Sequence, residues 1–408
     1  MIRKRRLLTD IENHLENKQY TIITGTRQVG KTSVLQLLFQ RLKAREESIT
    51  YVSLEDQRVL QAINEHPEKI LNYLPQKPTP ILEGNQGSRI YLLVDEVQYA
   101  DQPTNFLKYL YDKYEKNLKI IATGSSAFYI DRKFRDSLAG RKRIFNLYPL
   151  SFEEFLSFKN NDILLNELEL LRSNEYYESL HITELSSYFF EYLTFGGYPA
   201  VVLENDFNEK RALLTELKNA YIKRDLLESG IEKEGKFYLL LQLLADQTGS
   251  LVNKQELGTT IQLDAKTVDN YLYILQKCYH IQLVRPFYRN LRKELTKMPK
   301  VYFNDLGLRN SLLNRFAEVS TRADKGALLE NYFFLRFRES YGLEQIKFWR
   351  TADKQEVDFV IEESFGQGKA FEVKWDRAAF KPTKYQKFRK AYPKFPLKCL
   401  NTDNFYRL

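Results

Sequence analysis

The feature that most limits the fold is the stretch GTRQVGKT at residues 25–32. It has the form G-x-x-x-x-G-K-T, follows the apolar run YTIIT and precedes the helix-forming stretch TSVLQLLFQRLKA. In a strand–loop–helix context, backbone N–H groups and the positive end of the helix hold phosphate groups. The sequence therefore predicts a nucleotide-binding phosphate loop, and a glycine-containing turn without a ligand is the weaker interpretation.

Individual residues of this loop have expected roles. The Lys31 ammonium is expected to neutralise the β- and γ-phosphates of ATP, and the Thr32 hydroxyl to coordinate Mg²⁺. The predicted nucleotide-binding residues of the loop are Gly25, Thr26, Arg27, Gln28, Val29, Gly30, Lys31, Thr32 and Ser33.

A second motif fits the first. The apolar run YLLV ends in Asp95 and Glu96. We expect Asp95 to hold Mg²⁺ through water and Glu96 to polarise the attacking water, whereas two acids that merely cap a strand would have no such role. After the next apolar run, Thr123 or Ser125 is expected to sense the γ-phosphate. Capping of the following helix is an equally good interpretation of both residues.

Short β-rich runs alternate with helical stretches from residue 20 to 150, which indicates a parallel sheet buried on both faces. With these motifs the chain resembles P-loop ATPases of the AAA+ superfamily, in the division with an additional strand and a catalytic glutamate. That additional strand, between the two motif-bearing strands, is expected to be ITYVSLED at residues 49–56. AAA+ relatives usually assemble, so a homo-oligomer is expected.

The resemblance extends over nearly the whole chain. Residues 134–155 and 192–202 resemble bacterial and archaeal ATPases that carry a C-terminal restriction-endonuclease-like domain. This resemblance implies that Arg141, or Arg135, is an arginine finger supplied to a neighbouring protomer or within the chain. Alternatively, Arg141 pairs only with acids on its own surface.

The expected fold is α/β, with a P-loop parallel-sheet domain followed by three smaller parts. We expect an AAA+ core at residues 1–160, a helical lid at 161–235, a winged helix at 236–300 and an endonuclease-like α/β domain at 301–408. A chain of 408 residues is long enough for several domains.

Residues 255–290 have the spacing of a helix-turn-helix. Asp264 is expected to cap the second helix, with Leu257, Ile261 and Leu263 in the core. The cations between Arg285 and Lys297 would form a basic wing along nucleic-acid phosphates. A protein–protein or interdomain module is the alternative.

Near the C-terminus, Asp358, Glu372 and Lys374 match the D-(x)n-E-x-K pattern of restriction-type nucleases. Asp358 and Glu372 would bind Mg²⁺, and Lys374 would steady the attacking hydroxide or the phosphate. The pattern recurs at two helical, polar places in the chain, but here the residues lie on predicted strands. Strand alternation then puts these three groups on one face, opposite the apolar side chains Val357, Phe359, Ile361, Phe371, Val373 and Trp375.

The resemblance also implies a fourth site residue, Glu330. A glutamate that stabilises the helix dipole would equally explain Glu330, and a buried salt cluster would explain the whole set. The basic run at residues 381–394 has Tyr385, Phe388 and Tyr392 among its lysines, as a nucleic-acid surface would. An amphipathic helix with a hydrated cationic face is the other interpretation.

The formal net charge of +9 is spread unevenly, with a cationic stretch from residue 281 to 300 that suits a polyanionic partner. Only two cysteines occur, and we find no apolar stretch of the ~18 residues that a membrane span needs, so a cytoplasmic protein without membrane contact is expected. The sequence thus predicts an ATP-hydrolysing protein that binds DNA or another nucleic acid, with a Mg²⁺-dependent nuclease domain. The alternative is a nucleotide-gated regulatory or scaffold protein whose terminal domain binds a partner without cutting.

Overall fold

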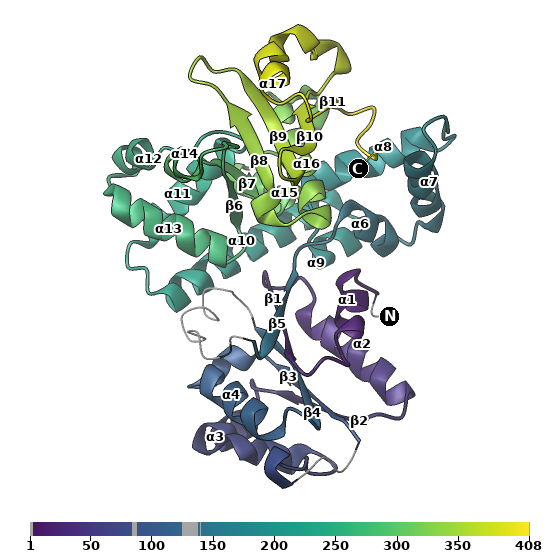
Figure 1. Cartoon of the computed structure of the whole chain (residues 1–408), viewed down its shortest axis with the longest axis vertical. Helices are drawn as coiled ribbons and strands as arrows, with labels where there is room; N and C mark the ends of the chain where they lie inside the picture. Colours follow the sequence, from purple (N-terminus) through teal and green to yellow (C-terminus); the bar gives the residue numbers. More distant parts are fainter. Residues whose placement is uncertain (1–2, 84–87, 125–137, 139, 408) are drawn as a thin grey trace. The chain divides into compact units, whose positions relative to one another are not determined.

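The computed structural model describes residues 3–83, 88–124, 138 and 140–407. The chain divides into two compact units (Figure 1). Unit 1 comprises Met1–Tyr148 with Lys277–Tyr279, and unit 2 comprises Pro149–Gln276 with His280–Leu408. Within the described residues, no helix is both long and apolar enough to cross a membrane.

Unit 1 is built on a five-stranded parallel sheet in the order β2-β3-β4-β1-β5. The strands are β1 (Tyr20–Gly25), β2 (Ser48–Ser53), β3 (Ile90–Asp95), β4 (Leu118–Gly124) and β5 (Lys142–Leu147). All residues of β1, β3 and β4 are buried, because helices cover both faces of the sheet. The α/β fold with a parallel sheet, as predicted, is confirmed.

Helices cover the two faces of this sheet separately (Figure 1). One face carries α1 (Leu7–Asn13) and α2 (Lys31–Ala44). The other carries α3 (Gln57–Glu65), the 3₁₀ helix η1 (Pro67–Tyr73) and α4 (Pro103–Tyr114), whose apolar side chains pack on alternate residues of the strands.

The strand that separates the two motif-bearing strands differs from the one predicted. It is β4, whereas residues 49–56 begin within β2 at the edge of the sheet. The burial pattern gives the physical reason. Five of the six residues of β2 are partly exposed, which suits an edge, while all seven residues of β4 are buried, as a strand with two neighbours requires.

Unit 2 contains helices and two sheets. The four-stranded sheet has the order β11-β10-β9-β8, and only the β10–β11 pair is parallel. Its strands are β8 (Ile346–Arg350), β9 (Glu356–Ser364), β10 (Gln367–Val373) and β11 (Leu397–Leu400), and α16 (Lys325–Ser340) packs against β10. The antiparallel pair β6 (Ile281–Val284) and β7 (Lys300–Phe303) forms the second sheet. The other helices are α6 (Phe152–Phe158), α7 (Asp162–Ser173), α8 (Ile182–Phe195), α9 (Pro199–Leu203), α10 (Phe207–Ser229), α11 (Glu234–Asp246), α12 (Lys254–Ile261), α13 (Ala265–Lys277), α14 (Leu291–Thr296), α15 (Leu306–Leu313) and α17 (Gln386–Ala391).

Helices α6, α7, α8, α9, α15 and α16 share one hydrophobic core with the C-terminal sheet. Aromatic rings join them: Phe189 of α8 stacks on Phe405 with centroids 4.0 Å apart and meets Tyr332 of α16 edge to face at 4.8 Å. Such ring pairs add stabilisation beyond the apolar area that they bury. The segment predicted as an ATPase lid therefore belongs to the same compact unit as residues 301–408.

Helices α12 and α13 form the expected helix–turn–helix segment. Asp264 accepts hydrogen bonds from the backbone N–H groups of Lys266 and Thr267, which caps the start of α13. Leu257 and Ile261 are buried, and Leu263 is half-buried. The segment between β6 and β7 contains α14, so it is not a plain β-wing.

Candidate functional site

The phosphate loop joins β1 to α2, and its backbone needs glycine at two places. At Gly25 a Cβ atom would lie 1.9 Å from the carbonyl oxygen of Leu147, so β5 approaches too closely for any side chain. Gly30, which caps α2, has φ +94°, and Gln28 also has a left-handed backbone with φ +54°. Thr32 and Ser33 lie in the first turn of α2, where backbone N–H groups lack helical acceptors and are available to an anion.

Side chains of the loop are arranged as a phosphate ligand would need them. The Lys31 ammonium is buried and donates hydrogen bonds to the carbonyl oxygens of Gly25 (3.1 Å) and Thr26 (2.8 Å). The hydroxyl oxygen of Thr26 is also buried, and among the described residues it has no hydrogen-bond partner. A buried hydroxyl without a partner is unfavourable, so these residues fit a nucleotide that supplies phosphate oxygens.

Arg5 forms hydrogen bonds that hold the phosphate loop in place, and the sequence did not predict this contact. Its guanidinium group is buried and donates to the carbonyl oxygens of Val29 (2.6 Å) and Tyr148 (2.7 Å). The planar guanidinium holds two acceptors at once in a fixed geometry. Arg5 thereby ties the phosphate loop to the chain that follows β5. No sequence signal marked it, because the basic start of the chain looks like a solvated surface.

The two acids of the second motif lie at the same edge of the sheet. Strand register aligns Ile23 of β1 with Thr123 of β4, and the next step along the β3–β4 pairing aligns Thr123 with Asp95. The Thr123 hydroxyl donates to Oδ1 of Asp95 and accepts a hydrogen bond from the backbone N–H of Glu96 at 2.9 Å. Thr123 therefore orients both acids. Ser125 and Arg135, the alternative residues of the sequence analysis, lie outside the described residues.

Two further side chains hold the acids. The Tyr51 hydroxyl of β2 donates to Oδ2 of Asp95 at 2.9 Å, and the Gln98 amide donates to Oε2 of Glu96. Burial and the neighbouring Asp95 carboxylate raise the pKa of Tyr51 well above its usual value, so its phenol stays a donor. Glu96 has a left-handed backbone with φ +57°, an uncommon conformation that often occurs at functional sites. The spacing of residues in the motif could not predict the contact of Tyr51 with Asp95, because Tyr51 lies on β2 and Asp95 ends β3.

Arg141 lies at the opposite end of the sheet from the phosphate loop. Its carbonyl oxygen accepts a hydrogen bond from the N–H of Tyr20, the first residue of β1. The phosphate loop begins at Gly25, the last residue of the same strand. Five strand residues separate the two ends by roughly 16 Å. The Arg141 guanidinium pairs with Asp112 of α4 at 2.7 Å. A finger acting on the loop of its own chain is therefore excluded, while one supplied to a neighbour stays a prediction.

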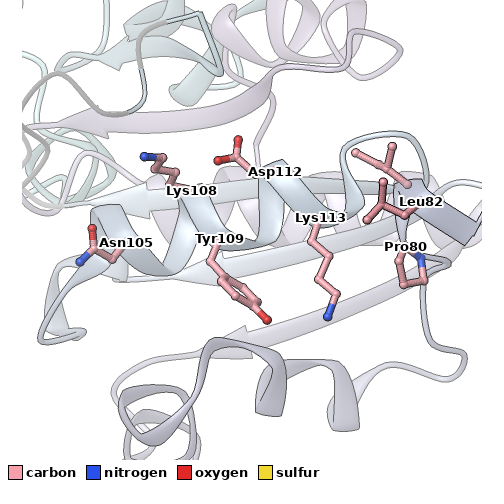
Figure 2. Close-up of a pocket in the computed structure, with 8 residues that line it drawn as sticks. Pro80, Leu82, Asn105, Lys108, Tyr109, Asp112 and Lys113 are labelled. Carbon is pink, nitrogen blue, oxygen red and sulfur yellow. The ribbon is translucent and has the colours of Figure 1, made fainter.

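A cavity of about 520 Å³ lies on the outer side of α4 (Figure 2). Asp112 lines it together with residues of the segment before β3. Tyr109 and Lys113 lie on α4, and Pro80 and Leu82 on the neighbouring segment (Figure 2). This cavity does not include any residue of the phosphate loop or either acid of the second motif.

In unit 2, the predicted acids come together on neighbouring strands. Register pairs Phe371 of β10 with Phe359 of β9, so the next pair along the hairpin is Glu372 opposite Asp358. Oδ2 of Asp358 accepts a hydrogen bond from the backbone N–H of Val373 at 2.8 Å, and Oε1 of Glu372 pairs with the Lys374 ammonium. Both acids are buried.

A second lysine, which the sequence analysis counted among the surface cations, lies in this cluster. Lys300 of β7 is buried, and its ammonium lies 2.6 Å from Glu356, 2.9 Å from Glu330 and 3.4 Å from Asp358. The Tyr302 hydroxyl donates to Glu330 at 2.5 Å. Lys300 is the first residue of a strand with one polar position among apolar ones, and this was the only signal that it points inward.

Burial shapes the ionisation of this cluster. Burial and the nearby Asp358 carboxylate raise the pKa values of both Glu330 and Glu372 to about 7. Although burial alone would lower the pKa of Lys300, the charges of Glu330, Tyr302 and the other acids raise it, so Lys300 stays charged. A third glutamate of the cluster, Glu356, also pairs with Arg350 at 2.5 Å.

A bulge in β9 places the side chain of Val357 on the face of the sheet opposite to the predicted one. Lys347 and Trp349 of β8, two residues apart, pair with Val360 and Val357, which are three residues apart. The extra residue turns Val357 to the face of Val360 and Ala370, away from Phe359, where it was expected. Bulges re-aim side chains and occur often beside functional sites. Here the bulge contains Asp358.

Few acids of this cluster are placed to hold a metal ion. Across the described ranges, no three His, Cys, Asp or Glu side chains are grouped so as to hold a metal ion. Asp358 and Glu372 face each other in the hairpin; burial raises the pKa of Glu372, and a hydrogen bond from the Tyr385 hydroxyl acts in the opposite direction. Two buried carboxylates that face each other repel unless a cation lies near them, so this pair is the candidate for a metal ion.

The two basic segments differ from each other. Between β6 and β7, the cations Arg285, Arg289, Arg292, Lys293 and Lys297 are all exposed. In the second segment, Tyr385 and Phe388 are buried and Tyr392 packs against the same apolar cluster. These rings fill the core beside β8–β10, so the expectation of aromatic platforms for bases was wrong. The segment contains a 3₁₀ helix (Pro382–Tyr385) followed by α17, and its cations are exposed.

Three family models match the chain. One described as an AAA domain matches residues 17–156, and two described as domains of unknown function, DUF8612 and DUF4143, match residues 186–319 and 325–406. None of the three names a winged helix or a nuclease.

Curated relatives that match the chain include two uncharacterized proteins. One from Methanocaldococcus jannaschii is 28% identical over 97% of this chain and 82% of its own length, and one from Haemophilus influenzae is 24% identical over 93% and 87%. Among solved structures, a Walker-type ATPase of Pyrococcus abyssi is 16% identical with a TM-score of 0.48, covering 77% of this chain and 96% of its own. The Aeropyrum pernix ORC2 protein is 13% identical with a TM-score of 0.36, covering 76% and 92%. The likeness to an AAA domain therefore rests on the sequence of residues 17–156, which match that family model.

Proposed function

We propose that unit 1 binds ATP with Mg²⁺ and hydrolyses it, in a cytoplasmic protein. The observation that carries the proposal is a convergence at one edge of the sheet. The phosphate loop, Asp95 with Glu96, and Thr123 all follow or end neighbouring parallel strands at their carboxyl ends. Ligands of open α/β sheets bind at this edge.

Each side chain has a role in this proposal. The Lys31 ammonium exchanges its two carbonyl acceptors for oxygens of the β- and γ-phosphates. The Thr32 hydroxyl and Asp95 hold Mg²⁺, which neutralises phosphate charge when it is bound. Glu96 orients the attacking water and accepts its proton, while Thr123 keeps the Glu96 backbone and the Asp95 carboxylate in position.

The test is steady-state ATP hydrolysis by the full chain with Mg²⁺, with and without nucleic acid. Glu96→Gln is expected to lower the turnover rate by at least about a hundredfold, because general-base groups contribute that much. A matched control is Glu115→Gln, which changes a glutamate at the far end of α4. Turnover that is equal in the wild type and in Glu96→Gln would reject the assignment of Glu96.

We also propose that the protein acts as a homo-oligomer in which Arg141 reaches the phosphates of a neighbouring protomer. The Arg141 side chain is one-third exposed, and its partner Asp112 is more exposed still. An exposed ion pair contributes little to stability, so Arg141 can exchange Asp112 for phosphate oxygens. Mixing Arg141→Ala with Glu96→Gln chains should restore turnover if the two residues act across protomers.

For unit 2, we propose binding of nucleic acid and Mg²⁺-dependent phosphodiester cleavage at Asp358, Glu372 and Lys374. Support comes from the facing of the two buried acids and from the exposed cations between β6 and β7. In this role Asp358 and Glu372 hold the metal, Lys374 steadies the attacking hydroxide or the phosphate, and Glu330 supports Asp358 through Lys300.

A second candidate function is a nucleotide-gated scaffold whose C-terminal domain binds a partner without cutting. Lys300 favours this alternative, because its ammonium already pairs with three acids of the cluster. The discriminating experiment incubates the full chain with Mg²⁺ or Mn²⁺ and single- or double-stranded DNA or RNA. Cleavage lost in both Asp358→Ala and Glu372→Ala supports the nuclease, and binding without cleavage supports the scaffold.

A further inference from the structure

We propose that Tyr279 is a positioning residue of the phosphate loop, so that the turn after α13 forms part of the nucleotide site. The inference rests on the proposed binding of ATP at this loop. It adds a residue that lies 255 positions after Thr24, the residue just before the loop. Tyr279 belongs to unit 1, although the chain immediately before and after residues 277–279 belongs to unit 2.

The Tyr279 hydroxyl lies where the strands that lead into the loop end. It donates a hydrogen bond to Oδ1 of Asn146 in β5 at 2.8 Å, and it lies 3.5 Å from the hydroxyl oxygen of Thr24 in β1. Strand register pairs Thr24 with Asn146, and the next residue of β1 is Gly25, the first of the loop. The hydroxyl therefore holds together the two strand ends beside the start of the loop.

The ring of Tyr279 contacts a second support of the loop. It meets the Tyr148 ring edge to face, with the two centroids 5.6 Å apart. The backbone carbonyl of Tyr148 accepts a hydrogen bond from Arg5, whose guanidinium also donates to the carbonyl of Val29 within the loop. Tyr279 is thus in contact with the strand before the loop and with the residue that Arg5 ties to its middle.

The backbone of Tyr279 has a conformation that tyrosine seldom adopts. The residue follows the end of α13 with φ +61°, in the left-handed region. The N–H of His280 donates to the carbonyl oxygen of Leu275 at 2.9 Å, which is the bond of a helix end that usually has glycine at the position of Tyr279. A side chain there is unfavourable, and such residues gather at functional sites. The contacts of the buried Tyr279 side chain supply a reason for it.

The consequence is that the phosphate loop and the end of α13 respond to each other. ATP orders the loop by binding its backbone N–H groups, and an ordered loop keeps Thr24 and Asn146 in place for the Tyr279 hydroxyl. Binding equilibria that are linked in this way affect each other by the same factor. ATP should therefore stabilise the turn after α13, and loss of the hydroxyl should weaken ATP binding.

The first experiment measures the Kd for ATP with Mg²⁺ by titration calorimetry of the full chain. Tyr279→Phe keeps the ring and should raise the Kd about fivefold, the usual effect of one lost hydrogen bond. Asn146→Ala removes the acceptor and should raise the Kd equally, and the double variant should bind no more weakly than either single variant. Tyr273→Phe, at an exposed tyrosine of α13, is the control and should leave the Kd unchanged.

The second experiment has a readout that packing of Tyr279 alone would not change. It follows amide hydrogen exchange by mass spectrometry in peptides that contain His280, whose N–H closes the end of α13. ATP should slow this exchange by about the same fivefold factor in the wild type and in Tyr273→Phe. The slowing should be lost in Tyr279→Phe and in Asn146→Ala. Because Asn146 is exposed, its variant tests the contact even if Tyr279→Phe unfolds.

The outcomes separate this inference from the proposed binding of ATP. If the wild type binds ATP and the folded Tyr279→Phe or Asn146→Ala variant binds it equally, the positioning role is wrong and the ATP site stands. The same holds if ATP still slows exchange at His280 in these variants. If the wild type does not bind ATP, both ideas fail. Equal, non-additive weakening in the two variants, with loss of the effect of ATP on exchange, supports the positioning role.

Discussion

The Tyr51 hydroxyl donates a hydrogen bond to Oδ2 of Asp95 at 2.9 Å, and so links the edge strand β2 to the acid that ends β3. Tyr51→Phe removes this hydroxyl and keeps the ring. We expect a fall in kcat of about fivefold, since one hydrogen bond to a charged group is lost while Thr123 still holds the other Asp95 oxygen. Tyr109→Phe, which removes a hydroxyl bonded to Glu68, should leave kcat unchanged in the same ATPase assay.

Thr123 is predicted to matter more, because it contacts both acids. Thr123→Val keeps the shape but loses the donor to Asp95 and the acceptor for the Glu96 N–H. We expect kcat to fall by about a hundredfold, with little change in the Kd for ATP. Thr123→Ser restores the hydroxyl and should recover most of the rate. Loss of ATP affinity in place of rate would instead mark Thr123 as a binding residue.

Arg5 is predicted to position the phosphate loop without touching nucleotide. Arg5→Met leaves the buried carbonyls of Val29 and Tyr148 without their donor, which costs about 1–3 kcal/mol per unsatisfied group. The Kd for ATP should rise about tenfold, measured by equilibrium fluorescence titration. Arg5→Lys reaches at most part of this geometry and should be intermediate. Arg6→Met, at the exposed neighbour, is the control; equal affinity in Arg5→Met and Arg6→Met would count against the role.

His14 should make the folded chain sensitive to acid. Burial, then Lys119 and Arg143, lower the pKa of His14 to about 4, although Gln19 opposes this, and its Nδ1 lies 2.8 Å from the Thr21 hydroxyl. In the folded state His14 takes up its proton only at a lower pH than in the unfolded state. The free energy of unfolding therefore falls as the pH drops from 6.5 toward 4. Between pH 8 and pH 5 we expect a loss of about 2 kcal/mol from this residue.

The measurement is urea unfolding of the wild type and of His14→Gln at both pH values. Glutamine does not titrate, so the variant should show a smaller difference between the two pH values, whatever its absolute stability. The same pH dependence in both proteins would show that His14 is not responsible.

The sequence was most informative where function depends on a contiguous motif. The place of residues 25–32 between a strand and a helix, and of Asp95 and Glu96 at the end of a buried strand, could be predicted from the apolar runs that flank them. Even the facing of Asp358 and Glu372 followed from strand alternation and the place of the turn. What failed was strand order: β2 and β4 are similar apolar runs, and only the burial of every residue in β4 distinguishes a central strand from an edge.

Contacts between distant residues were not predictable from one sequence. Arg5 and Lys300 both looked like members of surface basic runs, yet each is buried with acceptors far along the chain. A charged residue goes inward only when partners surround it, and those partners are brought by tertiary structure. The prediction for the aromatic residues of the last basic run was wrong for the opposite reason. These rings were expected at the surface, but they pack into the core.

The central claim is that the loop between β1 and α2 holds a nucleoside triphosphate. Titration calorimetry of the full chain with ATP and Mg²⁺ tests it directly, with Lys31→Ala and the exposed Lys43→Ala of the same helix as variants. We predict saturable binding, one ATP per chain, in the wild type and in Lys43→Ala, and its loss in Lys31→Ala. No binding by the wild type, or equal binding by Lys31→Ala, would contradict the claim.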